Sequence, residues 1–298
     1  MFKEKFKYYK RKSPLPDLSS VLEMNPPFDP KQVRRISPKM PGPLNLDSYG
    51  INSLDTWVLL ELIQHPGLII LRNPFTPKGQ RYWIRKCLEE YTRPPNKNNL
   101  LTHGLLSEND DWWHMCNDNE AKSKIYKQLR WVTLGYHHNW DTKVYSENLK
   151  NDFPPELNEL CKIIGKCIGN WDVDAQAAII NFYHMDSTLS GHTDHSEPNN
   201  TAPLFSFSFG QNAVFLIGGQ DINDDATAIL VESGDCIVMS SQSRLSYHGV
   251  PKIVATKLRP WSNEGMLSED WKDFENYVTE SRINMNVRQV LNPGQKHL

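Results

Sequence analysis

Residues 204–219, LFSFSFGQNAVFLIGG, decide the fold that this sequence predicts. In the first half, phenylalanine alternates with serine, which is the pattern of a β-strand whose two faces differ. Residues 210–212 (GQN) then supply a turn signal, and a second apolar run follows at once. Two short strands joined by a tight turn indicate an antiparallel sheet.

Similar β-rich runs occur on both sides of this stretch, and turn residues separate them. They are AAIINFYHM (177–185), ATAILVES (226–233), DCIVMS (235–240) and RINMNVRQV (282–290). Many short strands at regular spacing predict a β-sandwich or barrel. We therefore expect residues 176–298 to form an antiparallel double sheet.

The preceding residues, 51–175, contain patterns that are typical of helices. A helix is predicted over 52–63, where NSLD supplies a start and a broad apolar face follows. Further helices are predicted over 77–91 and 155–169, because each opens with a proline and Asn170 suits the left-handed end of the second. The expected fold class is thus α+β, with a helical layer packed on the double sheet.

The first 50 residues are basic and rich in proline. Eight of the twenty prolines lie between Pro14 and Pro43, which favours an extended arm with at most a short helix near residues 18–24. Residues 1–40 carry ten Lys/Arg and four Asp/Glu, a net charge of +6, and the rest of the chain carries −8. Such an arm can attract a polyanion or act as an import signal, or it can be a solvated tail.

Composition excludes several classes of protein. With 298 residues, 39% of them hydrophobic and 23% charged, the chain is long enough for a globular core. No apolar run approaches the roughly 18 residues that cross a bilayer, so no membrane partner is expected. The start of the chain, MFKEKFKYYKRK, lacks the apolar stretch of a secretory signal. Five cysteines without a CxxC pair favour a reducing, intracellular compartment.

Two histidines and an aspartate supply the clearest chemical signal. His192 and Asp194 are two residues apart, so in an extended strand their side chains share one face. His248 follows after several predicted strands, a separation that suits a return to the same mouth of a barrel. Two imidazoles and a carboxylate form the facial triad that leaves positions open on a redox iron. Taken alone, an HxD pair also occurs by chance.

The last predicted strand has one polar and one apolar face. Arg282, Asn284, Asn286 and Arg288 alternate with apolar residues. Two arginines on one face of a buried strand are costly unless a ligand pairs with them, and a guanidinium pairs bidentately with a carboxylate. A dianionic ligand is one interpretation of this face, and the solvent-facing side of an edge strand is the other.

Four motifs, taken in order, resemble those of a known family. They are NFY (181–183), HTD (192–194), SYHGVPKI (246–253) and RINMNVR (282–288). This order resembles the AlkB family of Fe(II)/2-oxoglutarate dioxygenases, whose last motif is Arg-x-Asn-x-x-x-Arg. Asn286 stands where the family often has threonine, and it keeps a hydrogen-bonding side chain. Residues 129–146 and 205–219 resemble the homologue 1 branch of that family in particular.

The resemblance implies a double-stranded β-helix, or jelly-roll, core preceded by an N-terminal helical layer. It implies that His192, Asp194 and His248 bind Fe(II), with 2-oxoglutarate and O2 as co-substrates. The residues implied to bind 2-oxoglutarate are Arg282 and Tyr183 at its distal carboxylate, Arg288 and Asn181 beside the carboxylate that binds iron, and Asn284 as a polar neighbour.

The resemblance also implies where nucleic acid binds. In AlkB-like enzymes the region that corresponds to residues 129–146 is similar to a lid over a flipped base, on which aromatic side chains can stack. The residues expected to contact the substrate are Arg130, Trp131, Tyr136, His138 and Tyr145. Lys122, Lys124 and Lys127 recur at near-helical spacing and suit phosphate contacts, and a solvated helix face is the alternative.

The implied activity is oxidative demethylation of nucleic acid, with release of formaldehyde, succinate and CO2. The candidate substrates are N1-methyladenosine in tRNA and N6-methyladenine in unpaired DNA, and oxidation of 5-methylcytosine in tRNA is a related one. Two alternatives stay open: the same chemistry on a methylated histone or other protein, and an inactive jelly-roll binding module. We expect a monomer that acts in the nucleus, the mitochondrion or the cytoplasm.

Overall fold

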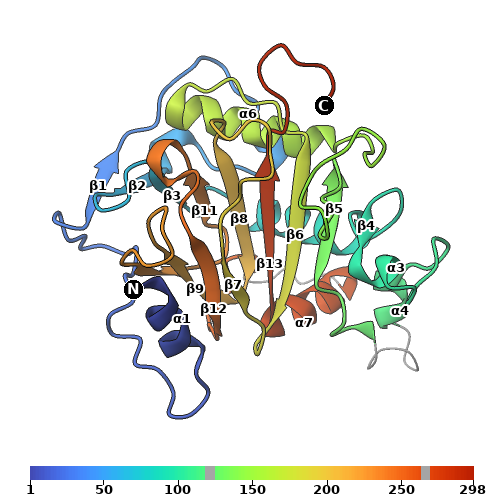
Figure 1. Ribbon diagram of the computed structural model, residues 1–298, viewed down its shortest axis with the longest axis horizontal. Helices are drawn as coiled ribbons and strands as arrows, with labels where there is room; N and C mark the ends of the chain where they lie inside the picture. The colour runs from blue at the N-terminus through green and yellow to red at the C-terminus, as the bar shows by residue number, and fades with distance from the viewer. Residues whose placement is uncertain (118–124, 263–268) are drawn as a thin grey trace.

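Two antiparallel sheets face each other in the structure, a computed structural model that describes residues 1–117, 125–262 and 269–298 (Figure 1). Within those residues the larger sheet has nine strands and the smaller has four. In spatial order, the larger sheet contains β1 (Val33–Ile36), β2 (Val58–Leu62), β3 (Leu68–Arg72), β11 (Cys236–Met239), β8 (Leu204–Gly210), β13 (Ser281–Arg288), β6 (Ala177–His184), β5 (Trp131–Gly135) and β4 (Lys97–Asn98). The smaller sheet contains β10 (Thr227–Val231), β9 (Asn212–Ile217), β12 (His248–Val254) and β7 (Leu189–His192).

The stretch 204–219 forms β8 and β9, which belong to different sheets. In β8 the phenylalanines enter the apolar core on the helical side of the sheet, while Ser206 and Ser208 bond to side chains of β13 on the inner side. Gly210 turns the chain with a φ of +83°, and a Cβ there would lie 2.4 Å from the carbonyl oxygen of Ser281. This turn therefore requires glycine, and it carries the chain from one sheet to the other.

The four flanking runs that were predicted as strands are confirmed as β6, β10, β11 and β13. The two histidine-bearing segments form β7 and β12, which pair with each other in the smaller sheet. Apolar side chains from both sheets meet between them, among them Leu60, Ile70, Phe215 and Val250. The site described below lies on the polar part of the same interior.

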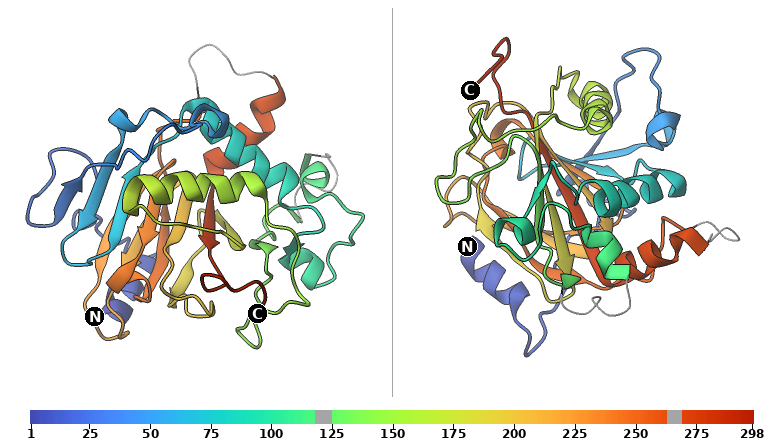
Figure 2. Two further views of the ribbon diagram at one scale, coloured as in Figure 1. Left: turned by 90° about the horizontal axis from the view of Figure 1, so that it is seen from above. Right: turned by 90° about the vertical axis from the view of Figure 1, so that its right-hand side faces the viewer.

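Among the described residues the helices are α1 (Phe2–Lys10), α2 (Pro77–Arg85), α3 (Asn99–Thr102), α4 (Trp112–Asn117), α6 (Pro155–Gly169) and α7 (Lys272–Glu280), with short turns η1 (Asp47–Tyr49), η2 (Leu54–Thr56), η3 (Lys86–Glu90), η4 (Ser241–Ser243) and η5 (Glu269–Trp271). The helices predicted over 77–91 and 155–169 are confirmed as α2 with its π-helical extension η3, and as α6. Asn170 ends α6 in the left-handed conformation, with a φ of 56°. Helix α6 runs across the larger sheet and buries Leu160 and Ile164 against it (Figure 2).

The prediction of a helix over 52–63 is wrong. Apart from the single turn η2, this segment is strand β2 in the larger sheet. Leu59 packs on the helical side of that sheet, and Leu60 and Leu62 pack between the sheets. A strand that is buried on both faces carries a continuous apolar run, and this run resembled the broad apolar face of a helix.

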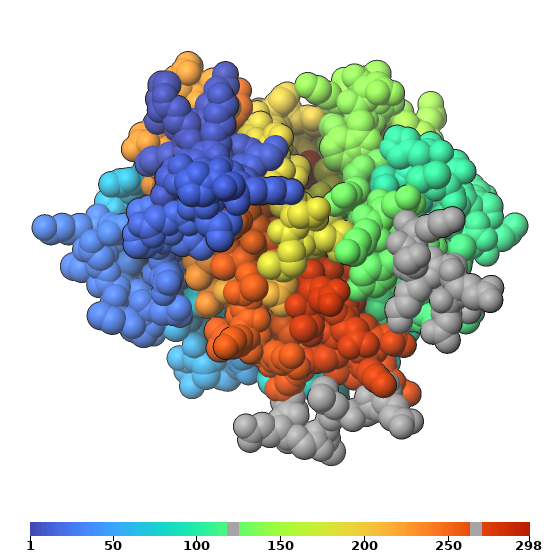
Figure 3. Space-filling view, turned by 90° about the horizontal axis from the view of Figure 1, so that it is seen from below, coloured from blue at the N-terminus to red at the C-terminus, as the bar shows by residue number. Residues whose placement is uncertain are grey.

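The expectation of an extended N-terminal arm is also wrong for its first part, because residues 2–10 form α1. Phe2, Phe6 and Tyr9 recur at helical spacing and cover the outer face of the smaller sheet, where Val214 and Leu216 lie. In Figure 3 this N-terminal segment, in blue, lies over the orange part of the chain. Residues 18–24 form no helix; Leu22 makes a parallel bridge to Ile229 instead.

The mixture of helices with two antiparallel sheets is α+β and is consistent with a jelly-roll core. Residues 51–175 supply β2, β3, β4 and β5 as well as helices, so the region expected to be a helical layer extends the larger sheet too. None of the helices in the described part of the chain has the length and apolar character needed to cross a membrane.

Candidate metal centre and cofactor pocket

His192, Asp194 and His248 come together at the ends of two neighbouring strands. His192 ends β7, His248 begins β12, and the two are cross-strand partners with ring centroids 4.4 Å apart. Asp194 follows β7, and its carboxylate oxygens lie 3.7 Å from His192 Nε2 and 3.6 Å from His248 Nε2. One ligand atom from each residue lies within 4.8 Å of the others, so the predicted triad is brought together.

The hydrogen bonds of both imidazole rings occupy Nδ1 and leave Nε2 facing the cluster. His192 Nδ1 donates to the carbonyl oxygen of Ser190 at 2.9 Å, and His248 Nδ1 donates to that of Ser246 at 3.0 Å. Because Nδ1 carries the proton in each ring, Nε2 presents its lone pair to the site. Burial, with a smaller contribution from His248, lowers the pKa of His192 to about 4, so this ring is neutral at pH 7.

Asp194 is the anion of the group. Burial alone would raise the pKa of Asp194, but Arg288 and both histidines lower it well below its ordinary value. Its Oδ2 is buried and has no hydrogen-bond partner in the described part of the chain. An ionised carboxylate that has one oxygen without a partner and lies beside two imidazole lone pairs fits a divalent cation, and this donor set is the one that holds non-haem Fe(II).

The polar face of β13 lines the interior next to this centre. Ile283, Met285 and Val287 are fully buried on the helical side, while Arg282 and Arg288 are buried on the opposite face. Strand β13 lies between β8 and β6, so it is not an edge strand and its arginines do not face solvent. Of the two interpretations of this strand, the ligand-binding one fits.

One end of this face carries donors without acceptors. Arg282 and Tyr183 are cross-strand partners, and the guanidinium lies 5.2 Å from the centre of the tyrosine ring. Arg282 Nη2 donates to Ser208 Oγ at 2.9 Å. Its Nε and Nη1, and the hydroxyl of Tyr183, find no partner among the described residues. Three buried donors left over in one place match the carboxylate of 2-oxoglutarate, whose charge would pair with the guanidinium.

The other residues implied for 2-oxoglutarate lie along the same face. Arg288 pairs with Asp194 Oδ1 at 3.0 Å and with Glu197 Oε1 at 3.1 Å, which leaves Nε as its donor without a partner in the described chain. Asn284 donates to Ser206 Oγ and to the carbonyl oxygen of Phe207, so its amide ties β13 to β8. Asn181 is the cross-strand partner of Asn284 on β6.

Two of the residues expected to contact substrate line a cleft of about 1130 Å³. Trp131 is the cross-strand partner of Asn181, and its ring centroid lies 5.2 Å from that of Trp140. His138 lies 4.8 Å from Trp140, and all three side chains line the cleft. Trp140 is 46% exposed, so the cleft has an open aromatic wall that begins beside the cofactor pocket.

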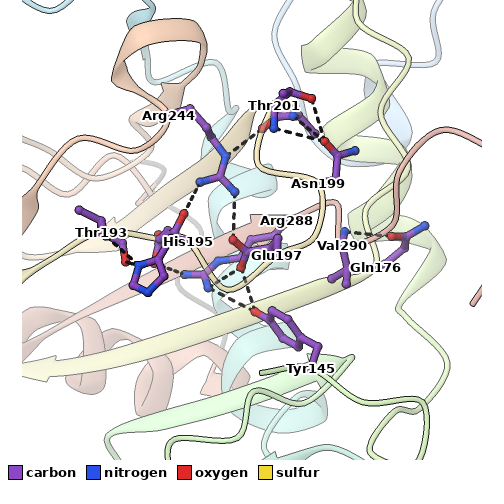
Figure 4. A network of polar contacts seen from close by, with 12 residues as sticks. Tyr145, Gln176, Thr193, His195, Glu197, Asn199, Thr201, Arg244, Arg288 and Val290 are labelled. Atoms are coloured by element: carbon purple, nitrogen blue, oxygen red, sulfur yellow. Dashed lines mark hydrogen bonds and ion pairs between the residues drawn. The ribbon is translucent and has the colours of Figure 1, made fainter. Parts of the chain in front are cut away.

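The other three expected contacts form hydrogen bonds within the protein, and of these Tyr136 and Tyr145 are buried while Arg130 is exposed. Tyr145 is buried, and its hydroxyl meets Glu197 and Arg288 (Figure 4). Tyr136 is buried against Val290 and Leu291, and its hydroxyl donates to Glu147. Arg130 Nη1 donates to Ser187 Oγ at 2.8 Å. Of the lysines noted with Arg130, Lys122 and Lys124 lie outside the described residues, and Lys127 is exposed.

Sequence reasoning missed two buried residues that touch the centre. Glu197 follows the HTD motif by three residues, and Arg244 precedes His248 by four. Their side chains are 0% and 3% exposed and form an ion pair at 3.0 Å. The sequence offered only their closeness to the ligand motifs, because a charged residue gives no local signal of burial.

Comparison with known proteins agrees with this geometry. Residues 67–288 match the family model of the 2OG-Fe(II) oxygenase superfamily. The chain is 35% identical to the mouse (Mus musculus) "Nucleic acid dioxygenase ALKBH1", over 99% of this chain and 85% of that protein. It is 31% identical to the Schizosaccharomyces pombe "tRNA demethylase abh1" (96% and 94% covered) and 28% identical to the Arabidopsis thaliana "DNA N(6)-methyladenine demethylase ALKBH1A" (94% and 90%).

The chain therefore belongs to the 2OG-Fe(II) oxygenase superfamily and, within it, to the AlkB family. Its similarity there is to the ALKBH1 proteins, over nearly its whole length. Membership implies Fe(II) as the cofactor and 2-oxoglutarate and O2 as co-substrates, and the cluster of His192, Asp194 and His248 suits that metal.

Proposed function

We propose that this protein is an Fe(II)/2-oxoglutarate-dependent dioxygenase that removes methyl groups from bases of nucleic acid. The observation that carries the proposal is the pairing of a His-Asp-His cluster with the buried, unpartnered donors of Arg282 and Tyr183. The relatives are named for a nucleic acid dioxygenase, a tRNA demethylase and a DNA N6-methyladenine demethylase, and these names supply the substrate class.

The position of each residue in the centre indicates its role. His192, Asp194 and His248 would hold Fe(II). With 2-oxoglutarate and O2, the bound metal supplies oxidation of a substrate C–H bond, and an N-methyl group oxidised in this way leaves as formaldehyde. Arg282 and Tyr183 bind and orient the distal carboxylate of 2-oxoglutarate. Three remaining residues complete the pocket: Arg288 Nε and Asn181 would bind the inner carboxylate, and Asn284 keeps β13 fixed against β8.

The cleft beside the centre favours a nucleic acid over a lysine-rich protein tail. Its lining includes the indoles of Trp131 and Trp140, the imidazoles of His103, His137 and His138, and Lys97. Its acidic side chains are Glu108 and Asp141. Indole faces stack on a base that has left its helix, whereas a lysine-rich tail would require a larger acidic surface than these two carboxylates provide. We propose that Trp131 and His138 contact the target base and that Arg130 binds the phosphate backbone of the nucleic acid.

The intact donor set also argues against a binding module, since a protein that only binds does not require open metal positions beside a carboxylate pocket. One chain supplies every residue of the centre, so we propose that the monomer is active. We also propose that it acts inside the cell, in the nucleus, the mitochondrion or the cytoplasm.

The test is release of formaldehyde and succinate from two matched oligonucleotides, with Fe(II) and 2-oxoglutarate present. One oligonucleotide is a tRNA stem-loop with N1-methyladenosine, and the other is a DNA bubble with N6-methyladenine. We expect both products from at least one of them, and none from the His192→Ala variant. Succinate without formaldehyde would point to a methylated protein as substrate. If the iron-loaded enzyme released neither product, the binding module would be the better description.

Replacing Trp131 with alanine is expected to weaken oligonucleotide binding specifically. Stacking of a base on an aromatic side chain is worth about 1–3 kcal/mol, so KM for the oligonucleotide should rise roughly 5- to 150-fold. KM for 2-oxoglutarate should not change. Steady-state kinetics with each substrate varied in turn measures both. Trp171→Ala is the matched control, because Trp171 is half-buried at the end of α6 and packs against the helical side of the core. An equal loss in both variants would contradict the assignment.

A further inference from the structure

We propose that Glu197 is a positioning residue for the metal ligand Asp194. It would act by holding the two arginines that in turn hold this aspartate. The inference rests on the metal centre of the proposed function. It adds a part to that centre that neither the ligand motifs nor the 2-oxoglutarate motif contains.

Glu197 is completely buried, and both of its carboxylate oxygens accept hydrogen bonds (Figure 4). Its Oε2 accepts a hydrogen bond from Arg244 Nη2 at 3.0 Å. Its Oε1 accepts from Arg288 Nη1 at 3.1 Å and from the hydroxyl of Tyr145 at 3.1 Å. A buried carboxylate of this kind is stable only while both arginines stay in place, so the four side chains must be ordered together.

Both arginines also contact Asp194, one at its backbone and the other at its side chain. Arg244 Nη1 donates to the backbone carbonyl of Asp194 at 2.7 Å, and its Nε donates to the carbonyl of Ala202 at 2.9 Å. Arg288 Nη2 meets Asp194 Oδ1 at 3.0 Å. The backbone and the side chain of the ligand are therefore each fixed by an arginine whose second contact is Glu197. Two carboxylates balance two guanidinium groups in this cluster.

Asp194 depends on these contacts because of where it lies in the chain. Strand β7 ends at His192, and residues 193–196 belong to no strand or helix. The sheet ladder thus orients His192 and His248 but does not reach Asp194. The arginines come from elsewhere: Arg244 follows the turn η4 and Arg288 ends β13. Glu197 joins these separate elements, and Asp194 Oδ2 is left beside His248 Nε2.

The Glu197→Gln variant tests the proposal with little change of shape. An amide keeps one acceptor but puts an N–H group against an arginine, so one of the two arginines loses its contact. We expect the affinity for Co(II), measured by the visible absorption of the bound ion with 2-oxoglutarate present, to fall about 10- to 100-fold, as for other residues that orient metal ligands. The absorption band itself should change, because the carboxylate ligand is no longer held in one orientation.

Glu275→Gln is the matched control. Glu275 is also a buried glutamate, and it accepts hydrogen bonds from the indole nitrogens of Trp261 and Trp271 and from Arg259. Its contacts include neither the metal ligands nor Arg288. This variant should lose thermal stability yet bind Co(II) with the affinity and spectrum of the parent protein. The contrast separates a positioning role from a general loss of stability.

Parent-like Co(II) affinity in Glu197→Gln would overturn the role of Glu197 and leave the metal centre standing. A parent protein that bound no Co(II) would contradict the metal centre itself, and the inference with it. If Glu197→Gln does not fold, Arg244→Lys decides the matter. A lysine does not reproduce the planar set of donors with which Arg244 contacts Glu197, Ala202 and Asp194, so the Co(II) affinity of this variant should also fall. An unchanged affinity would again overturn the proposal.

Discussion

Asp194→Ala is expected to abolish 2-oxoglutarate turnover, with a fall of roughly a thousandfold or more. The variant removes the carboxylate of the His192, Asp194, His248 cluster, and it leaves the positive charge of Arg288 facing the place of the cation. Loss of a metal that stabilises charge in the transition state costs several kcal/mol, and about 4 kcal/mol corresponds to this factor. Succinate release under saturating Fe(II) measures the effect.

The fold should survive this change, because Arg288 keeps its pairing with Glu197. Circular dichroism and a melting curve will show whether it does. Asp186→Ala is the control, since Asp186 lies exposed in the turn that precedes β7. It should retain the activity of the parent protein. If Asp194→Ala retained a tenth of the parent turnover, the assignment of the metal ligands would be wrong.

Arg282→Met should raise KM for 2-oxoglutarate by about 30- to 4000-fold. Truncating one member of a buried, hydrogen-bonded charge pair costs about 2–5 kcal/mol, and the guanidinium is the positive charge at that end of the pocket. Methionine fills the volume of the stem but offers no donor. Titration of 2-oxoglutarate into protein loaded with Mn(II) measures the same loss without turnover.

A graded series makes this prediction specific. Tyr183→Phe removes one hydroxyl donor to a charged group, so its effect should be smaller, about tenfold. Arg282→Lys keeps the charge but loses the planar pair of donors, and it should fall between the other two. KM for the oligonucleotide should stay constant across the series. A parent-like KM for 2-oxoglutarate in Arg282→Met would rule out the carboxylate pocket.

Strand periodicity explains one part of the centre that the sequence predicted. Arg282 and Arg288 are separated by an even number of residues, so strand β13 presents both on one side. The interior face of β13 follows from this rule, whereas the pairing of His192 with His248 depends on the register between β7 and β12, and Asp194 lies beyond the end of β7. The strands themselves were recognisable because turn residues separate short β-branched and aromatic runs.

The parts that sequence did not predict depend on contacts between distant segments. Segment 52–63 has the apolar residues of a helix, and only its neighbours β1 and β3 in the larger sheet make it a strand. Helix α1 was hidden because proline dominates the composition of the first 50 residues but is absent from residues 2–10. Glu197 finds its partners Arg244 and Arg288 through loop packing, 47 and 91 residues away, which no local pattern encodes.

The alternation of β13 has a consequence for how this protein can vary over time. Exchanging one side chain in the strand alters one contact, but inserting or deleting one residue reverses every side chain beyond that point. A change placed just before Arg282 would turn the guanidinium groups into the apolar layer under α6, and Ile283, Met285 and Val287 would fill the pocket. Point mutations can therefore change this strand one contact at a time, whereas a change in its length would remove the arginines from the pocket and abolish the site. Length changes should accumulate in the surrounding loops instead.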